Sequence, residues 1–512
     1  MLKDKKILFA TWGSERKDDA PYQNWYLPIK DIFSKVVVFD PSKEYFRYGK
    51  DVMNNKFLNL VEKEKPDYLF MLLMYDEFYL ETLYNVRKIS PNTIMVNLFS
   101  DDDWRYEEFS RYYGLFFDHS IIQHDVAKKY DNDGIKGVNF IVGVNSSLFK
   151  PIKAKKKYDI SFYGRPNPSR VDYLSFLVKK GLDVHIWGDG WGKYDFFAKN
   201  YHGKLDAGNL PRVISESKIN LGFTLGSYGQ KQTKGKPFEI PACKSFLLIE
   251  HFDRYFDFFK KDELITFENK EDLLEKIKYY LKNEKQREKI VNKAYQKVIK
   301  HYDQKVLLEN FFTKSKADKS KGINFNQHDK EIINLKIEDL EDSTKILNLT
   351  KDKKYISIIE DSKVHPLKNY FQARSLDLSG KDISCCDYYV SSSSLGNYIL
   401  FKTGLANKKV DINNFHKMIF SSQLMFRKTY FVNNLSKIKS FIAKKTSLIE
   451  NNAVFVSIPL IQTSKLPDVD FETLSKSTQV KFIDKLYSLY YQNKLLFSLY
   501  PYSLMIKSIK NN

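Results

Sequence analysis

The stretch QKQTKGKPFEIPACKSFLLIE, residues 230–250, carries the strongest pattern in this chain of 512 residues. It starts as a basic loop, with Lys234 and Lys236 on either side of a glycine, and continues into a short helical turn. We expect Pro241 in or near the first turn of that helix, where its missing N–H costs nothing. The apolar run Ser245–Ile249 has the length of a buried strand, so the pattern predicts a loop, a helix and a strand in that order.

The charges at this helix start indicate which ligand would bind there. Free N–H groups and the helix dipole favour an anion at the start of a helix, and Lys234 and Lys236 add positive charge. Glu239 follows about one turn later, where a carboxylate accepts hydrogen bonds from hydroxyl groups. Together these residues predict a sugar-nucleotide site, with cations for the diphosphate and a carboxylate for the ribose. The alternative is that the lysines are solvated and Glu239 caps the helix.

A family resemblance favours the ligand site. The segment KGKPFEIPACKSFLLIE, residues 234–250, resembles the signature of the spore-maturation (CgeB-like) glycosyltransferases, in which basic residues and Phe-Glu-x-Pro-Ala-Cys-Gly precede an apolar strand. That group is similar to the GT-B glycosyltransferases near the retaining family-four enzymes. The resemblance implies that Glu239 holds the nucleotide ribose. This sequence has Lys244 where the family usually has Gly.

Composition sets the broad class of protein. The length suits about three domains, and the formal net charge of +20 favours anionic partners such as nucleotide diphosphates, anionic lipid surfaces or nucleic acid. The three cysteines, Cys243, Cys385 and Cys386, show no disulfide or metal spacing, which fits a reducing cytosol. We expect neither a signal peptide nor a transmembrane helix.

The first half of the chain alternates short apolar runs with amphipathic stretches, which is typical of a parallel sheet with helices on both faces. Gly13 follows the first expected strand, where open α/β sheets bind ligands, although a simple turn glycine is the alternative. Helices are expected over Asp51–Glu64 and Glu77–Lys88. The expected strands are Ile7–Thr11, Val36–Phe39, Tyr68–Met74, Ile94–Leu98, Ser120–Gln123 and Val138–Val142.

Acidic residues and histidines near two of these strand ends are candidates for catalysis. Asp102 and Asp103 follow the fourth strand, where they would bind the acceptor or act as a base; the alternative is a solvated loop with one Asp as a helix cap. His119 and His124 flank the next strand, and a histidine with a pKa near neutrality is able to act as a base. A lone histidine is more often structural.

The second half resumes the alternation after a basic linker at residues 151–157. Its expected strands are Tyr158–Tyr163, Val184–Trp187, Ile219–Leu225, Phe246–Ile249 and Leu264–Phe267. The Phe-Tyr-Gly-Arg segment ending at Arg165 resembles a turn of GT-B donor domains, which implies that Arg165 or Arg170 neutralises the diphosphate. Arginine suits this role because its planar fork binds phosphate oxygens in pairs. Gly188 would let the backbone approach the donor closely.

Two amphipathic stretches, Glu271–Leu281 and Lys285–His301, match the terminal helices that cross back over the first domain in GT-B enzymes. The resemblance therefore covers about residues 5–312. It implies an α/β GT-B fold of two Rossmann-like domains that face a cleft, with residues 1–150 on the acceptor side and residues 151–315 binding the nucleotide sugar.

The remaining sequence changes in composition. Residues 316–330 are a polar linker, and residues 331–512 are expected to form an α+β accessory domain. A strand over Lys354–Ile359 ends in Glu360 and Asp361, and this part distantly resembles a family-two GT-A glycosyltransferase that lacks its nucleotide-binding half. Further strands are expected over Ile383–Val390 and Met418–Arg427. The basic, apolar stretch Val480–Lys510 would either rest on an anionic membrane or pack as core helices.

We therefore expect a glycosyltransferase of the hexosyltransferase type (EC 2.4), which moves a sugar from a nucleotide-sugar donor to a glycan, lipid or protein acceptor in cell-surface glycan biosynthesis. The alternatives are a non-enzymatic binder of nucleic acid or anionic polymer, and a sugar-nucleotide epimerase on the same fold. The resemblance implies no cofactor and no metal; Glu360 and Asp361 would hold a metal only in an active C-terminal module. The expected location is the cytoplasm, with peripheral contact at the inner face of the membrane, and nucleic acid is not an expected partner.

Overall fold

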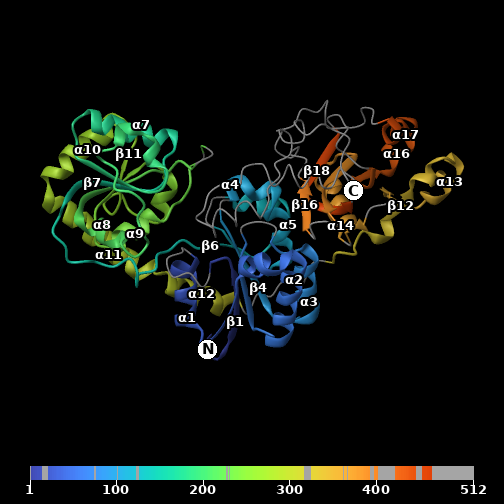
Figure 1. Ribbon diagram of the computed structural model, residues 1–512, viewed down its shortest axis with the longest axis horizontal. Helices are drawn as coiled ribbons and strands as arrows, with labels where there is room; N and C mark the ends of the chain where they lie inside the picture. The colour runs from blue at the N-terminus through green and yellow to red at the C-terminus, as the bar shows by residue number, and fades with distance from the viewer. Residues whose placement is uncertain are drawn as a thin grey trace.

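The computed structural model describes residues 2–13, 21–73, 77–100, 102–122, 126–226, 229, 231–315, 324–360, 363–365, 367–392, 397–401, 421–444 and 452–463. It has three parts, which Figure 1 shows along the long axis of the molecule. The N-terminal domain lies at the centre, the second domain at the left, and the C-terminal module at the right.

The first domain contains a six-stranded sheet in the order β2-β1-β3-β4-β5-β6, and every pair in it is parallel. The strands are β1 (Lys6–Thr11), β2 (Lys35–Phe39), β3 (Tyr68–Leu72), β4 (Ile94–Phe99), β5 (His119–Ile122) and β6 (Val138–Phe140). The helices are α1 (Leu27–Ile32), α2 (Pro41–Glu64), α3 (Leu80–Ile89), α4 (Asp102–Arg105), α5 (Ser110–Tyr113) and α6 (Ala127–Asn132). The central strands are buried along their whole length, as a parallel sheet covered on both faces requires.

The second domain repeats this design with a five-stranded sheet in the order β11-β10-β9-β7-β8. Its strands are β7 (Tyr158–Tyr163), β8 (Val184–Trp187), β9 (Ser217–Gly222), β10 (Leu247–Glu250) and β11 (Ile265–Phe267). Its helices are α7 (Pro168–Lys179), α8 (Leu210–Glu216), α9 (Lys236–Ala242), α10 (Lys270–Lys282) and α11 (Glu284–His301). The two parallel sheets confirm the expected GT-B fold class, with strand ends that differ from the predictions by up to three residues.

The prediction that α10 and α11 cross back over the first domain is wrong. Leu273 and Ile277 of α10 lie in the core of the second domain, and Val298 of α11 lies in the same domain beside α9. The helix that crosses back is the next one, α12 (Gln304–Ser315), whose Phe312 packs against the rings of Phe33 and Tyr68. The second domain therefore ends before residue 304, and residues 304–315 belong to the core of the first.

The C-terminal module is α+β, as expected, and its sheet mixes parallel and antiparallel pairs in the order β12-β13-β17-β15-β18-β14, with β16 beside β15. Its strands are β12 (Ile332–Lys336), β13 (Tyr355–Ile359), β14 (Lys363–Val364), β15 (Ile383–Ser392), β16 (Asn397–Phe401), β17 (Leu424–Arg427) and β18 (Ala453–Thr463). Its helices include α13 (Ser343–Leu349), α14 (Lys368–Ser379), α16 (Lys428–Asn433) and α17 (Leu435–Lys444). The predicted amphipathic stretch Val480–Lys510 lies outside the described residues.

The module is not a separate body, because it shares a core with the first domain. Phe371 of α14 packs against the rings of Tyr112 and Phe116, and Phe325 stacks on Phe116 at 4.8 Å between centroids. His365 also contacts Glu81 at 2.7 Å. Burial of several aromatic rings is worth several kcal/mol, so this interface holds the module firmly on the first domain.

Among the described residues, no helix combines the length and the apolar composition that crossing a membrane requires.

Candidate nucleotide-sugar site

The stretch that dominates the sequence folds into α9 and the strand that follows it. Gly235 precedes the helix, Pro237 occupies its first turn, and Phe238 and Ile240 are buried in the core of the second domain. The expectation for Pro241 is wrong, since this proline lies near the last turn of α9. It is tolerated there because the helix ends one residue later, so little of the helix depends on the missing N–H.

Lys244 takes the place of the family's usual glycine and keeps the turn that glycine would make. Its φ is 53°, in the left-handed region that favours glycine. The N–H of Lys244 donates to the carbonyl of Pro241 at 2.8 Å, and the N–H of Ser245 donates to that of Ile240 at 3.2 Å. The helix therefore ends as the signature requires, with the backbone cost of a left-handed lysine.

Glu239 is held in place by one tyrosine. The hydroxyl of Tyr163, at the end of β7, donates to Oε2 of Glu239 at 2.8 Å. No described residue donates to Oε1, and Glu239 lines a cavity. Burial raises the pKa of Glu239 above its usual value, while the bond from Tyr163 and the nearby charge of Lys236 oppose that rise. One carboxylate oxygen is thus fixed by the protein and the other is available to a ligand.

Lys236, at the first position of α9, is packed between two rings. Its Nζ lies 3.6 Å from the ring centroid of Tyr163 and 4.3 Å from that of Phe162, and it donates to the main-chain carbonyl of Tyr163. Burial lowers the pKa of Lys236 well below its usual value, and the positive charge of Arg170 lowers it further. An anion beside this ammonium group would restore its charged form.

Two more cations converge on the same place. Arg170, in the first turn of α7, donates to the carbonyl of Arg165 at 2.7 Å, and Lys234 donates to that of Leu225 at 3.1 Å. Nε of Arg170 is buried with no hydrogen-bond partner among the described residues. Burial lowers the pKa of Arg170. Three cations close enough to perturb one another indicate a site for an anion with more than one negative oxygen.

The two other donor-site predictions in this domain have different surroundings. The Arg165 side chain is 82% exposed and lies 4.0 Å from Asp189, so it is not part of the buried cation group. Gly188 has a φ of 135°, and a Cβ there would lie 2.3 Å from the carbonyl oxygen of Gly164. The glycine therefore allows the loops after β7 and β8 to touch, which positions the turn before Arg170.

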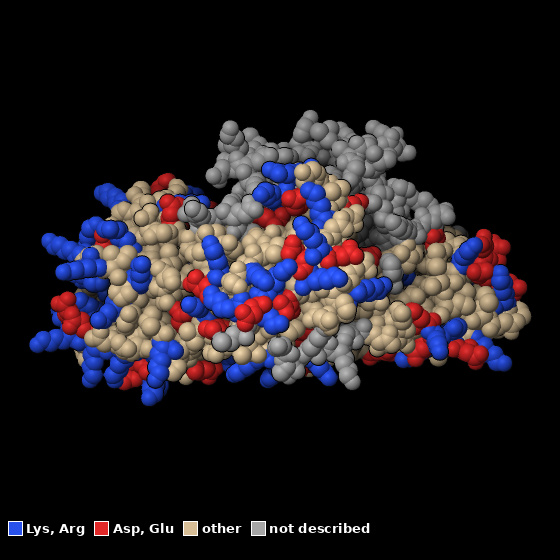
Figure 2. Space-filling view, turned by 90° about the horizontal axis from the view of Figure 1, so that it is seen from below, with Lys and Arg blue, Asp and Glu red and all other residues tan. Residues whose placement is uncertain are grey.

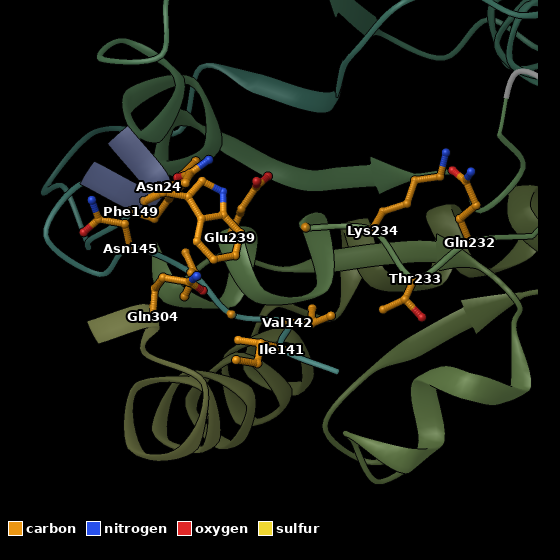
Figure 3. Close-up of a pocket in the computed structure, with 14 residues that line it drawn as sticks. Asn24, Ile141, Val142, Asn145, Phe149, Gln232, Thr233, Lys234, Glu239 and Gln304 are labelled. Carbon is orange, nitrogen blue, oxygen red and sulfur yellow. The ribbon is translucent and has the colours of Figure 1, made fainter. Parts of the chain in front are cut away.

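A cavity of about 280 Å³ lies where the two domains meet. Its walls come from the first domain, from the connection at residues 141–145 and from the loop that begins α9. Figure 3 shows Glu239 with Asn24, Asn145 and Gln304 toward one end and Lys234 toward the other. Amide and carboxylate groups at one end suit hydroxyl groups, and the ammonium group at the other suits a phosphate.

Asp102 does not face this cavity. It is fully buried in the first domain, where Oδ2 accepts a hydrogen bond of 2.6 Å from Tyr130 and Oδ1 accepts one from Ser110. These contacts favour a structural role for Asp102, and acceptor binding or base catalysis by this residue stays a prediction. The backbone of Asp103 continues α4, and His124 lies outside the described residues. His119 is buried against Phe311 of α12.

The remaining predicted site residues are placed only in part. Gly13 is a turn glycine with a φ of 66°, and its N–H donates to Oδ2 of Asp40 at 2.9 Å. This bond supports the turn interpretation. Glu360 follows β13, whereas Asp361 lies outside the described residues. Within the described part of the chain, no group of three metal-binding side chains is present.

Several residues of the site could not be assigned from the sequence. Tyr163 was expected only as the end of a strand, and its hydroxyl has no sequence signal that points to Glu239. Asn24 and Gln304 belong to no sequence motif. Asn24 lies in the helical turn before α1 and Gln304 begins α12, so only the fold brings them to the same cavity. Asn145 could have been predicted from the sequence, since it lies in the connection between the domains.

Most of the second domain and the first part of α12 match a known protein family. Residues 170–312 match the family described as glycosyl transferase-like. This part of the chain resembles glycosyl transferases. The match contains α9, most of α7 and the residues from Arg170 to Glu239. No curated protein matches the chain.

Solved structures are similar to about three fifths of the chain. A glycosyltransferase from Rickettsia africae has 14% identity and a TM-score of 0.45, over 62% of this chain and 100% of that one. Anabaena Alr3699/HepE, solved with UDP and glucose, has 11% identity and a TM-score of 0.45, over 61% and 100%. A candidate UDP-N-acetylglucosamine 2-epimerase from Listeria monocytogenes has 12% identity and a TM-score of 0.42, over 61% and 96%. Identities this low carry no information on donor, acceptor or reaction.

Proposed function

We propose that this protein transfers a hexosyl group from a nucleotide-sugar donor to a glycan, lipid-linked or protein acceptor. The observation that carries the proposal is the group formed by Arg170, Lys234, Lys236 and Glu239, of which Lys234 and Glu239 line a cavity between two Rossmann-like domains. The resemblance to the CgeB-like signature implies that Glu239 holds the ribose, and the resemblance of the turn at Arg165 to GT-B donor domains implies that Arg165 or Arg170 neutralises the diphosphate. A role in cell-surface glycan synthesis, in the cytoplasm with peripheral membrane contact, belongs to the same proposal.

The donor would lie with its diphosphate against the cations and its ribose against Glu239. Positive charge held rigidly near the leaving diphosphate stabilises the charge that develops as the glycosidic bond breaks. Arg170 and Lys236 are already fixed by main-chain carbonyls, so little reorganisation is needed on binding. In this proposal the side chains, rather than a metal ion, balance the diphosphate charge.

The cation group also bears on the two alternatives. A binder of nucleic acid would present basic and aromatic side chains along one groove. On the face that Figure 2 shows, Lys and Arg side chains around the end formed by the second domain are interspersed with acidic side chains. An epimerase would use the same donor site, so it is distinguished by its product.

The test is a panel of sugar nucleotides incubated with the protein, with and without candidate acceptors. The expected result is release of the nucleoside diphosphate that depends on an acceptor. Conversion of the donor sugar to its epimer without an acceptor would instead establish the epimerase. Salt-sensitive binding to nucleic acid, with no binding of any sugar nucleotide, would contradict the proposal.

A further inference from the structure

A second charged hollow lies in the C-terminal module, away from the donor cavity. Its volume is about 460 Å³, and five of its eight lining residues are basic. The basic residues come from the turn before β12, the turn before β13, the end of β17 and the start of α16; they are Lys330, Lys353, Lys354, Arg427 and Lys428. This set defines the C-terminal basic pocket.

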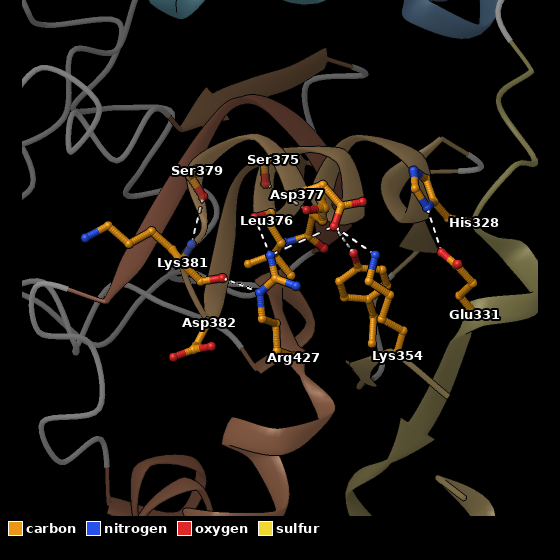
Figure 4. A network of polar contacts seen from close by, with 12 residues as sticks. His328, Glu331, Lys354, Ser375, Leu376, Asp377, Ser379, Lys381, Asp382 and Arg427 are labelled. Atoms are coloured by element: carbon orange, nitrogen blue, oxygen red, sulfur yellow. Dashed lines mark hydrogen bonds and ion pairs between the residues drawn. The ribbon is translucent and has the colours of Figure 1, made fainter. Parts of the chain in front are cut away.

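Two of these cations are held rigidly by a polar network. Lys354 donates to Oδ1 of Asp377 at 3.0 Å, and Tyr355 donates to the same carboxylate. Arg427 donates to the carbonyls of Leu376 at 2.7 Å and Lys381 at 2.9 Å. Figure 4 shows Lys354, Arg427 and Asp377 pointing toward one another. Burial favours the neutral form of Asp377, but the bonds from Tyr355 and Lys354 outweigh it and lower the pKa of that carboxyl.

The charges of the other three cations, Lys330, Lys353 and Lys428, are not balanced by a described carboxylate. Lys353 donates to the carbonyl of Lys330 at 2.9 Å, and Lys428 donates to that of Lys351 at 2.5 Å. Within the described part of the chain, no carboxylate forms an ion pair with Lys330, Lys353 or Lys428. An ammonium group has three donors, so Lys353 and Lys428 each keep two for a ligand.

The two acidic residues of the lining narrow the class of ligand. Glu331 is held by Nδ1 of His328 at 3.0 Å, and Asp352 completes the acidic part of the wall. Carboxylates repel a purely anionic surface but accept hydrogen bonds from hydroxyl groups. The lining contains no apolar side chain that would insert into a lipid layer. A pocket with both cations and carboxylates therefore fits a saccharide, whose hydroxyl groups donate to the carboxylates and whose anionic groups bind the cations.

We propose that the C-terminal basic pocket binds an acidic saccharide. If the proposed transferase function holds, this saccharide is the polymeric acceptor. Figure 1 places the module and the second domain on opposite sides of the first domain, so a long chain would be anchored at one end of the molecule while its growing end reaches the donor cavity. The binding itself does not depend on that function.

The test is calorimetric titration of the full-length protein with a heparin-derived pentasaccharide at low and moderate salt. The double variant Lys353→Ala/Lys428→Ala removes two cations of the pocket. The matched control, Lys285→Ala/Lys289→Ala, makes the same change in net charge on exposed positions of α11. We expect the first double variant to weaken binding about tenfold or more and the control to change it by less than about twofold.

Three results would overturn the proposal. One is equal weakening by both double variants, which would mean that net charge alone attracts the saccharide. Another is no binding of the pentasaccharide by the parent protein. The third is binding of the parent only to vesicles containing phosphatidylglycerol, lost in the Lys353→Ala/Lys428→Ala variant, which would assign the pocket to a membrane. Nucleotide binding measured on the same three proteins tests the proposed transferase separately, since these substitutions lie outside the donor cavity.

Discussion

Two carboxylates, Glu239 in the second domain and Asp102 in the first, each have a tyrosine partner but differ in their surroundings, since Glu239 is half-buried and Asp102 is fully buried. Each accepts a short hydrogen bond from a tyrosine, Tyr163 for Glu239 and Tyr130 for Asp102. The difference lies in the second oxygen. Ser110 donates to that of Asp102, whereas that of Glu239 has no donor among the described residues and its side chain lines the cavity. A hydrogen bond from a tyrosine holds each carboxylate in position. A ligand is able to bind only where the second oxygen has no donor from the protein.

The largest effect should come from Asp102→Ala. The change leaves the hydroxyls of Ser110 and Tyr130 buried without an acceptor, so the free energy of unfolding should fall by about 3–5 kcal/mol. Urea unfolding of the parent and of the variant measures this loss, with Asp102→Asn as the milder control. An Asp102→Ala protein that is as stable as the parent but inactive would instead support a catalytic role for Asp102.

The next effect separates the two arginines predicted to bind the diphosphate. Arg170→Ala removes a half-buried guanidinium from the cation group, so affinity for a nucleoside diphosphate should fall by about 2 kcal/mol, roughly 30-fold. Arg165→Ala, at a position that is 82% exposed, should cost less than about 1 kcal/mol. Titration calorimetry with the same nucleotide measures both. The reverse order would move the phosphate site to the exposed edge of the domain.

A smaller effect is expected on the pH dependence of donor binding. The hydroxyl of Tyr163 opposes the burial that raises the pKa of Glu239, so Tyr163→Phe should raise that pKa further. Protonation weakens Glu239 as an acceptor for the ribose hydroxyl groups, and donor affinity should therefore begin to fall at a higher pH in the variant as the pH is lowered. At neutral pH the loss should be about 1 kcal/mol.

The measurement is the dissociation constant of the nucleotide from pH 5 to 8 in both proteins. Titration of the nucleotide's own phosphate is common to both, so the difference between the two curves reports Glu239. Superimposable curves would show that Tyr163 does not control this carboxyl.

The smallest effect tests the turn that ends α9. Lys244→Gly should stabilise the protein by about 0.5–1 kcal/mol, because glycine adopts the left-handed conformation without the cost that lysine bears. The matched control is Lys65→Gly, because Lys65 at the end of α2 also has a positive φ, of 41°. Both variants should bind the nucleotide as the parent does. Destabilisation by Lys244→Gly alone would mean that the lysine side chain makes a compensating contact.

The surroundings of Glu239 were easier to predict from the sequence than those of Asp102. The order of loop, helix and strand around Glu239 follows from local patterns, so α9 and β10 lie close to where the sequence predicts them, while the role of the cations near them stays a prediction. Whether Asp102 points inward depends on Ser110 and Tyr130, which lie 8 and 28 residues away in the chain. A pattern of residue types at a strand end contains no information on that direction.

The packing of the C-terminal module was missed for a related reason. A change in composition after residue 330 suggested an independent unit, but its aromatic residues contact rings more than two hundred residues earlier. Apolar residues read the same whether they fill a domain's own core or an interface with another domain. The crossing helix was misplaced similarly, because α10 and α11 are amphipathic but this pattern does not show which domain a helix packs against, and α12 has a weaker pattern of this kind.

The most direct test of the central claim is nucleotide affinity in Glu239→Gln and Asp102→Asn, measured by calorimetry on proteins shown to be folded. Both changes replace a tyrosine-bonded carboxylate with an amide of the same shape. We expect Glu239→Gln to weaken binding of the nucleoside diphosphate by about 1.5–3 kcal/mol, the value of one charge-assisted hydrogen bond, and Asp102→Asn to leave it unchanged. Equal affinity in the parent and in Glu239→Gln, or a loss confined to Asp102→Asn, would contradict the assignment of the donor site.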